Sequence, residues 1–178
     1  MNPAIEQILL KLYDCLDYGI SYRAKKGLYI QSFFEHGKYN KKQIQDSIRD
    51  LNKEKLIKKK ENYDGSILIS LTEKGRLRAL NIKFRYLKNK KEGWDKKWRM
   101  VAFDIPDECR KGRDAIRYRL KVTGFFELQE SLFLYPFDCQ KEIDEFVKIF
   151  KIEKYVHFGV LELIDNQSWL LKFFNLNR

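Results

Sequence analysis

Apolar residues recur at helical spacing near the start of the chain, and this pattern predicts three helices. The first helix ends near Gly19, because glycine readily adopts the left-handed backbone that closes a helix. A second helix is predicted over residues 27–34, closing near Gly37. Asn40 can cap a third helix, because its side chain accepts a hydrogen bond from an N–H of the first turn. The inward-facing residues of the first and third helices are Ile5, Ile8, Leu9, Leu12 and Leu16, and Ile44, Ile48 and Leu51.

A β-hairpin and a further helix are predicted next. The strands cover residues 56–60 and 66–71, and the turn between them ends in Asp64-Gly65, a strong signal for a tight turn. Thr72 can cap a helix over residues 73–80. Residues 83–93 continue that helix and then become a charged linker that ends in glycine.

The second half of the chain alternates strands and helices. A strand over residues 98–103 ends at Asp104, and Pro106 suits the first turn of a helix that stops at Gly124. This pattern continues with a strand at 127–135, a helix with Ile143, Phe146, Val147 and Phe150 on one face, and a strand at 156–163. Residues 125–126 and 169–176 can add edge strands or a short helix. The order predicts an α+β, ferredoxin-like domain of split β-α-β units.

Positive charge is concentrated in the first half. Residues 1–93 hold 21 basic and 11 acidic side chains, whereas residues 94–178 hold 15 and 14. The chain is therefore interpreted as two units, with domains at 1–82 and 94–178 and a linker at 83–93. Because basic side chains that neutralise phosphates release counterions, double-stranded DNA is the first partner to consider for the basic unit. A solvated lysine-rich surface without a partner is the alternative.

Three helices, a basic hairpin and a closing helix are the parts of a winged helix-turn-helix. In that module the third helix enters the major groove of DNA and the hairpin follows the backbone. The string Leu71-Thr72-Glu73-Lys74-Gly75-Arg76, after Leu56-Ile57, resembles winged-helix transcription factors. A winged helix that binds protein is the alternative. The expected DNA-binding residues are Lys42, Gln43, Asp46, Arg49, Lys53, Lys58, Lys59, Lys60 and Tyr63.

Several other classes of protein are disfavoured. Cys15, Cys109 and Cys139 are far apart and odd in number, which indicates a reducing compartment rather than a disulfide framework. No zinc-ligand spacing, phosphate loop or other cofactor motif is present. The start of the chain lacks the features of a signal peptide, and no apolar run is long enough to span a membrane. A cytoplasmic protein without a cofactor is expected.

The second half also resembles a known family. The stretch from Trp94 through residues 98–106, Arg113, Leu120 and Gly124-Phe125 to residues 128–136 is similar to the middle domain of PaaX-family regulators. The tail, with residues 164–166 and 173–176, also resembles PaaX-like proteins. The resemblance implies a winged helix followed by a domain similar in fold to the small CRISPR-associated endonuclease. Family members that sense an aryl-CoA thioester carry a further C-terminal domain, so the resemblance leaves the effector small molecule open.

Asp104 carries the catalytic alternative. In the small CRISPR-associated endonuclease, an aspartate that ends the first strand resembles this position and pairs across a dimer to hold Mg²⁺ for phosphodiester attack. PaaX-like repressors share the Phe-Asp-Ile-Pro string without that activity, and there Asp104 would cap the helix near Pro106. The sequence favours the cap.

The sequence therefore predicts a homodimeric DNA-binding transcriptional regulator, a repressor in which the second domain forms the dimer. Two alternatives remain. One is a CRISPR-associated, metal-dependent endonuclease or spacer-adaptation subunit, and the other is a protein-binding winged-helix adaptor.

Overall fold

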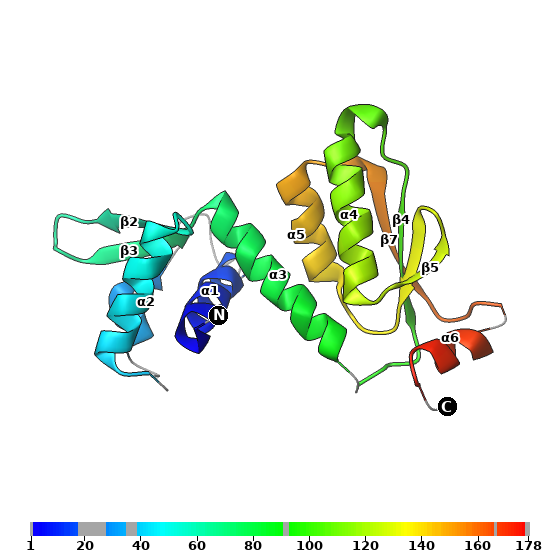
Figure 1. The fold of residues 1–178 in the computed structure, drawn as a ribbon, viewed down its shortest axis with the longest axis horizontal. Coiled ribbons are helices and arrows are strands. Elements are labelled where there is room, and N and C mark those ends of the chain that lie inside the picture. Colours follow the sequence, from blue (N-terminus) through cyan, green and yellow to red (C-terminus); the bar gives the residue numbers. More distant parts are fainter. Residues whose placement is uncertain (1, 18–27, 35–38, 91–92, 166, 177–178) are drawn as a thin grey trace. The chain divides into compact units, whose positions relative to one another are not determined.

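The computed structural model describes residues 2–17, 28–34, 39–90, 93–165 and 167–176. The chain divides into two compact units, Met1–Lys83 and Phe84–Arg178 (Figure 1). Both contain helices and strands, as the α+β prediction requires. The predicted helix end at Gly19 and the turn at Gly37 lie outside the described residues.

Unit 1 packs its helices around a small antiparallel sheet. Its elements in chain order are α1 (Pro3–Asp17), β1 (Leu28–Tyr29), the 3₁₀ helix η1 (Ile30–Phe33), α2 (Lys41–Lys53), β2 (Ile57–Glu61), β3 (Ile67–Leu71) and the start of α3 (Glu73–Asn89). The sheet order is β1-β3-β2. Its core is formed by buried apolar residues of α1, α2 and both hairpin strands, among them Leu9, Leu12, Ile48, Leu51 and Ile69.

The helix predicted over residues 27–34 is wrong. Leu28 and Tyr29 instead form β1, which pairs with Ile69 and Leu68 of β3. The next four residues form η1, and the Ser32 hydroxyl donates a 2.8 Å hydrogen bond to Tyr29 O. Serine side chains that bond to nearby backbone favour short turns over continuous helix. The strand itself depends on β3, which lies forty residues later in the sequence.

The helix after Asn40 is confirmed as α2. The Asn40 side chain accepts a hydrogen bond from Gln43 N at 2.9 Å, and the Gln43 side chain accepts one from Asn40 N at 3.0 Å. This reciprocal capping box satisfies two backbone donors at the start of the helix. Ile44, Ile48 and Leu51 are buried, as their spacing predicted.

The helix that follows the hairpin continues past residue 80 into residues 83–93, as predicted, and α3 ends at Asn89. Gly75, in the first turn of α3, allows the backbone of this helix to lie close to the backbone of Leu56. A Cβ atom at this position would lie 1.9 Å from Leu56 O. The same carbonyl accepts a hydrogen bond from Thr72 N at 3.0 Å. Glycine is therefore required where α3 crosses the start of the hairpin.

Unit 2 has the element order β-α-β-β-α-β. Its elements after α3 are β4 (Trp98–Phe103), η2 (Asp107–Cys109), α4 (Arg110–Thr123), β5 (Phe126–Gln129), β6 (Leu132–Tyr135), α5 (Gln140–Phe150), η3 (Glu153–Tyr155), β7 (Val156–Leu161) and α6 (Ser168–Phe173). The sheet order is β5-β6-β4-β7, with antiparallel neighbours throughout. This order is that of ferredoxin-like split β-α-β units.

One predicted strand of unit 2 is in fact two. Residues 127–135 were expected to be continuous, but the chain turns at Glu130-Ser131 and forms the β5–β6 hairpin. The turn lacks glycine and proline, so the local sequence does not signal it. The helix stop at Gly124 is confirmed, because this residue ends α4 with φ 98°.

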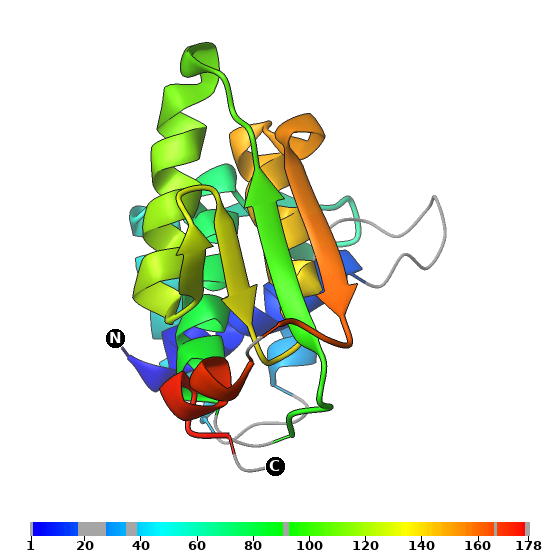
Figure 2. The same ribbon diagram turned by 90° about the vertical axis from the view of Figure 1, so that its right-hand side faces the viewer.

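One face of the sheet of unit 2 is covered by helices, and one end of the other face is covered as well. Helices α4 and α5 lie on one face, and the short α6 lies on the other near one end (Figure 2). Trp98, which is fully buried, packs with Leu134, Leu170 and Leu171 on the α6 side. The tail therefore contributes a short helix, one of the two possibilities that its sequence left open.

Candidate nucleic-acid interface

A polar stripe runs along the solvent-facing side of α2. Lys42, Asp46, Arg49 and Lys53 follow one another at intervals of four, three and four residues, so they lie on one side of the helix. The buried Ile44, Ile48 and Leu51 occupy the opposite side. Three members of the stripe are basic and exposed, whereas Asp46 is partly buried. The structure thus brings four of the nine expected DNA-binding residues together on one helix face.

Within this stripe, Asp46 and Arg49 interact with each other. Arg49 Nη2 lies 3.0 Å from Asp46 Oδ1, and the two side chains are 73% and 43% exposed. An exposed pair of this kind adds little to stability, because solvent screens it. It does bias the guanidinium of Arg49 toward one orientation while leaving its other N–H groups accessible.

Gln43 differs from the other members of the predicted set. It lies to one flank of the stripe, and its side-chain oxygen accepts the hydrogen bond from Asn40 N. Base recognition by glutamine normally uses both the oxygen and the NH₂ group. Gln43 is therefore engaged in capping α2, and its NH₂ group is the part available to a partner.

The three lysines of β2 do not share one face. Side chains along a strand alternate, so Lys58 and Lys60 point to one side and Lys59 to the other. Lys58 and Lys60 pair across the hairpin with Ser70 and Leu68, whereas Lys59 pairs with the buried Ile69. All three lysines are exposed. The sequence indicated a single cluster, and the pleat of the strand divides it in two.

Tyr63 lies at the tip of the hairpin and is fully exposed. The turn beneath it is held by polar side chains. Asn62 Nδ2 donates to Ser66 Oγ at 2.8 Å, and Ser66 Oγ donates to Asp64 Oδ1 at 2.6 Å. Gly65 has φ 76°, the left-handed conformation that this turn requires. A rigid turn thus presents an aromatic side chain to solvent.

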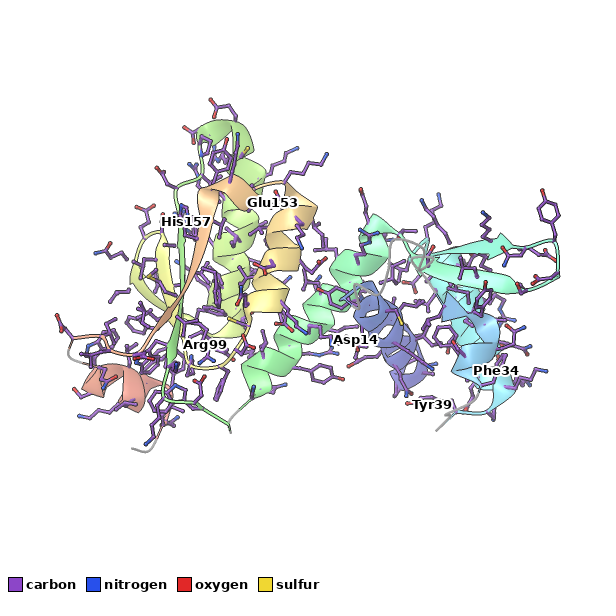
Figure 3. All side chains as sticks on the ribbon, turned by 180° about the vertical axis from the view of Figure 1, so that it is seen from behind. Asp14, Phe34, Tyr39, Arg99, Glu153 and His157 are labelled. Atoms are coloured by element: carbon purple, nitrogen blue, oxygen red, sulfur yellow. The ribbon has the colours of Figure 1, made fainter. Side chains whose placement is uncertain are left out.

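Lys41 was missed as a candidate residue. It is the first residue of α2, it is exposed, and its Nζ lies 5.8 Å from the centre of the Phe34 ring. Figure 3 labels Phe34 and Tyr39, the described residues on either side of 35–38. A run of two lysines after a cap residue was the available sequence signal, but the contact with Phe34 depends on the η1 conformation.

Asp104 is exposed directly after β4. Its backbone N–H donates to Tyr155 O at 3.0 Å. The helix-cap interpretation is wrong: η2 begins at Asp107, Pro106 holds the N-cap position, and η2 has no side-chain cap hydrogen bond. The turn is held instead by Arg113, which donates to Ile105 O at 3.2 Å and to Asp107 Oδ1 at 2.8 Å. Within the described residues, no group of three or more His, Cys, Asp or Glu side chains could hold a metal.

Arg99 forms a buried polar centre in unit 2, on β4 (Figure 3). It donates to both carboxylate oxygens of Asp95, at 2.5 and 2.6 Å, and to the carbonyls of Lys97 and Pro136. The hydrogen bonds from Arg99 lower the pKa of Asp95 to about 2. The pair joins the segment before β4 to the end of β6. Figure 3 also shows His157 on β7, where it is exposed.

Comparison with known families identifies this second unit. Residues 91–169 match the family model of the PaaX protein central Cas2-like domain. The chain carries the central domain of the PaaX family. The match spans the PaaX domain from the residues before β4 into α6, and it includes Asp104 and the Asp95–Arg99 pair. The resemblance drawn from residues 94–136 is therefore confirmed. No curated protein matches the chain.

The α2 stripe and the hairpin lie before the residues that match the PaaX domain model. None of the described helices combines the length and the apolar content that crossing a membrane requires. The three cysteines are not joined by disulfides, and Cys139 is fully buried.

Proposed function

We propose that this protein is a DNA-binding transcriptional regulator of the PaaX type that acts as a dimeric repressor, with unit 1 as its winged helix. The observation that carries the proposal is the stripe of Lys42, Asp46, Arg49 and Lys53 on the solvent side of α2. The element order supports it, because a short β1 pairs with β3 of the hairpin that follows α2. The match to the PaaX central domain supports it further, because the PaaX family suggests regulation of transcription.

In this proposal α2 enters the major groove and the hairpin follows the phosphate backbone. Arg49 reads guanine, because a guanidinium can donate to both O6 and N7 of that base. Lys42, Lys53, Lys58 and Lys60 neutralise phosphates and fix the register of the protein on the duplex. Tyr63, at the tip of the hairpin, contacts the backbone or the adjacent minor groove.

The dimer forms through unit 2 in this proposal. Strand β7 is at an edge of the sheet, and Val160 on this strand is 51% exposed. Leu163, just after it, is 73% exposed. Exposed apolar residues along an edge strand favour pairing with another chain, and a symmetric dimer would match a pseudo-palindromic site. Sedimentation of the full chain measures the assembly. Val160→Lys should shift it toward monomer, and a wild-type monomer at micromolar concentration would contradict this part of the proposal.

The two alternatives have less support. A nuclease needs several oxygen ligands around its metal, and within the described residues of one chain Asp104 belongs to no group of three or more His, Cys, Asp or Glu side chains. An adaptor would not require basic residues on both α2 and the hairpin. The family match favours neither alternative.

The salt dependence of DNA binding tests the function directly. Each lysine–phosphate contact contributes about 0.9 to the slope of log affinity against log salt concentration. The double variant Lys58→Ala, Lys60→Ala should reduce the slope by about 2 and weaken binding to all duplex sequences alike. Affinity is measured by fluorescence anisotropy at several salt concentrations, with full-length protein and duplexes enriched from a random pool.

The matched control is Lys111→Ala, Lys141→Ala, which removes the same charge from exposed positions of α4 and α5. It should leave the slope unchanged. If both double variants reduce affinity equally, the lysines contribute only general charge, and the hairpin is not a DNA contact.

A further inference from the structure

Unit 2 contains a cavity that the proposed DNA-binding function does not use. Its volume is about 430 Å³, and it lies beside the end of α3, β6 and the residues after α6. Its walls include Lys88, Lys90, Tyr135, Phe137, Phe173 and Asn175. Cavities that bind small molecules typically have volumes of about 300–1,000 Å³. The size is therefore suitable for one small organic ligand.

The charge of the cavity is positive. Among the described residues of its lining, Lys88 and Lys90 are the charged ones, and both are exposed. Lys90 Nζ lies 5.4 Å from the centre of the Phe137 ring. Since the described residues of the lining include no carboxylate, an anionic group on a ligand would meet two ammonium groups there.

Aromatic rings form the apolar part of the same cavity. Phe173 is 53% exposed, an unusual state for a phenylalanine, and its ring is 4.8 Å from that of Phe174 in an edge-to-face arrangement. Phe137 is buried. The Tyr135 hydroxyl donates to Leu87 O, so tyrosine supplies only its ring to the cavity. An exposed phenylalanine beside ammonium groups suits stacking of a planar ring system.

Asn175 adds a group that can both donate and accept hydrogen bonds. It is exposed and has φ 52°, a left-handed conformation that asparagine tolerates better than most residues. Its backbone N–H donates to Lys172 O at 3.2 Å, which fixes the chain just after α6. A side-chain amide is suited to the edge of a heterocyclic base.

We propose that this cavity binds a nucleotide, a nucleoside carrying one or two phosphates. The base would stack on Phe173, its edge would meet the Asn175 amide, and the phosphates would lie between Lys88 and Lys90. Stacking on aromatic side chains contributes about 1–3 kcal/mol per base where it has been measured by alanine substitution. The proposal concerns unit 2 alone and does not depend on DNA binding by unit 1.

Tryptophan fluorescence of the full-length protein tests the proposal. All three tryptophans, Trp94, Trp98 and Trp169, belong to unit 2, and the Trp98 ring is 5.9 Å from that of Phe174 in the cavity wall. The signal therefore reports on this unit and not on the basic unit 1. The probes are nucleoside mono- and diphosphates of adenine and guanine, the corresponding nucleosides, inorganic phosphate and benzoate.

At least one nucleotide should bind at least tenfold more tightly than its nucleoside, than phosphate and than benzoate. Lys88→Ala, Lys90→Ala should weaken nucleotide binding about tenfold, whereas Lys111→Ala, Lys141→Ala should not. Phe173→Leu, which keeps apolar packing but removes the ring face, should also weaken it. Far-ultraviolet circular dichroism confirms that each variant is folded. Absence of saturable nucleotide binding, equal effects of the two lysine pairs, or benzoate binding as tight as a nucleotide would overturn the proposal.

Discussion

The Tyr135 hydroxyl donates a 2.5 Å hydrogen bond to the backbone carbonyl of Leu87. Tyr135 is on β6 and Leu87 is near the end of α3, where its carbonyl also accepts a hydrogen bond from Lys90 N at 2.9 Å. The Tyr135 ring also stacks on Phe125, with ring centres 4.4 Å apart. Burial raises the pKa of Tyr135, so the hydroxyl remains a donor at all physiological pH values. This contact joins the last turn of α3 to the sheet of unit 2.

Tyr135→Phe should therefore destabilise unit 2 by about 1 kcal/mol, the usual contribution of one buried hydrogen bond. The ring packing is retained, so the loss isolates the hydroxyl. Urea denaturation followed by tryptophan fluorescence measures the effect. Tyr118→Phe is the control, because Tyr118 is 64% exposed, and it should leave stability unchanged. Equal effects of the two substitutions would contradict this role.

Asp95 should make stability depend on pH in acid. Because its folded-state pKa is about 2 and the ordinary pKa of the group is 3.8, its contribution is complete above pH 3.8 and is lost as the pH falls through about 2. The carboxylate is 46% exposed, so solvent screening keeps the contribution to about 1 kcal/mol or less. Asp95→Asn should flatten the dependence of the urea midpoint on pH across this window. An unchanged dependence would show that other carboxyl groups control the acid transition.

Gly75→Ala should destabilise unit 1 strongly, although alanine is the better helix former by about 1 kcal/mol. The new Cβ would lie 1.9 Å from Leu56 O, a backbone atom that cannot move without shifting the start of β2. We expect a loss of about 3 kcal/mol or more, measured by thermal and urea denaturation.

Gly112→Ala in α4 is the matched comparison, because its nearest obstacle is the Ile152 Cγ2 atom at 2.7 Å. A side chain can change its rotamer, so the loss should be smaller than for Gly75→Ala. The reverse order would show that the hairpin accommodates α3 more easily than the close approach implies.

Asp46→Ala should separate sequence preference from general affinity for DNA, if α2 is the recognition helix. Removing the carboxylate favours binding to any duplex, because a negative charge leaves the stripe. It also frees Arg49 from its 3.0 Å contact and should reduce discrimination for guanine by about 1 kcal/mol. Asp50→Ala, on the same helix, should raise general affinity only. Competition between selected and random duplexes measures both effects, and identical profiles for the two variants would rule out positioning by Asp46.

Asp104→Asn and Asp104→Ala should both change stability by less than about 0.5 kcal/mol, because the side chain does not cap η2. The measurement is the urea midpoint of each variant. Incubation of wild type with Mg²⁺ or Mn²⁺ and labelled DNA or RNA should give no cleavage. Metal-dependent cleavage that disappears in Asp104→Asn would support the nuclease alternative.

Much of the architecture was predictable from the sequence where a helix cap or a turn depends on neighbouring residues. The capping box of Asn40 and Gln43, the Asp64-Gly65 turn and the helix stop at Gly124 each involve residues within a few positions of one another. The exposed stripe on α2 follows from helical periodicity alone. Charge composition indicated a basic first unit, and the family resemblance indicated the PaaX domain. Charge counts and sequence similarity can both be determined without knowing the fold.

The sequence by itself thus determined the α2 helix with its caps and solvent-facing side, and the strand–helix alternation of unit 2. Only the tertiary structure decided that residues 28–29 form a strand, since that strand needs Ile69 and Leu68 as partners. It also decided the split of residues 127–135 into a hairpin, the contact of Tyr135 with Leu87 and the cavity between Lys88 and Phe173. Strand pairing, the Tyr135–Leu87 hydrogen bond and the walls of the cavity each bring together residues that are distant in the sequence. Patterns over a few neighbouring residues do not contain that information.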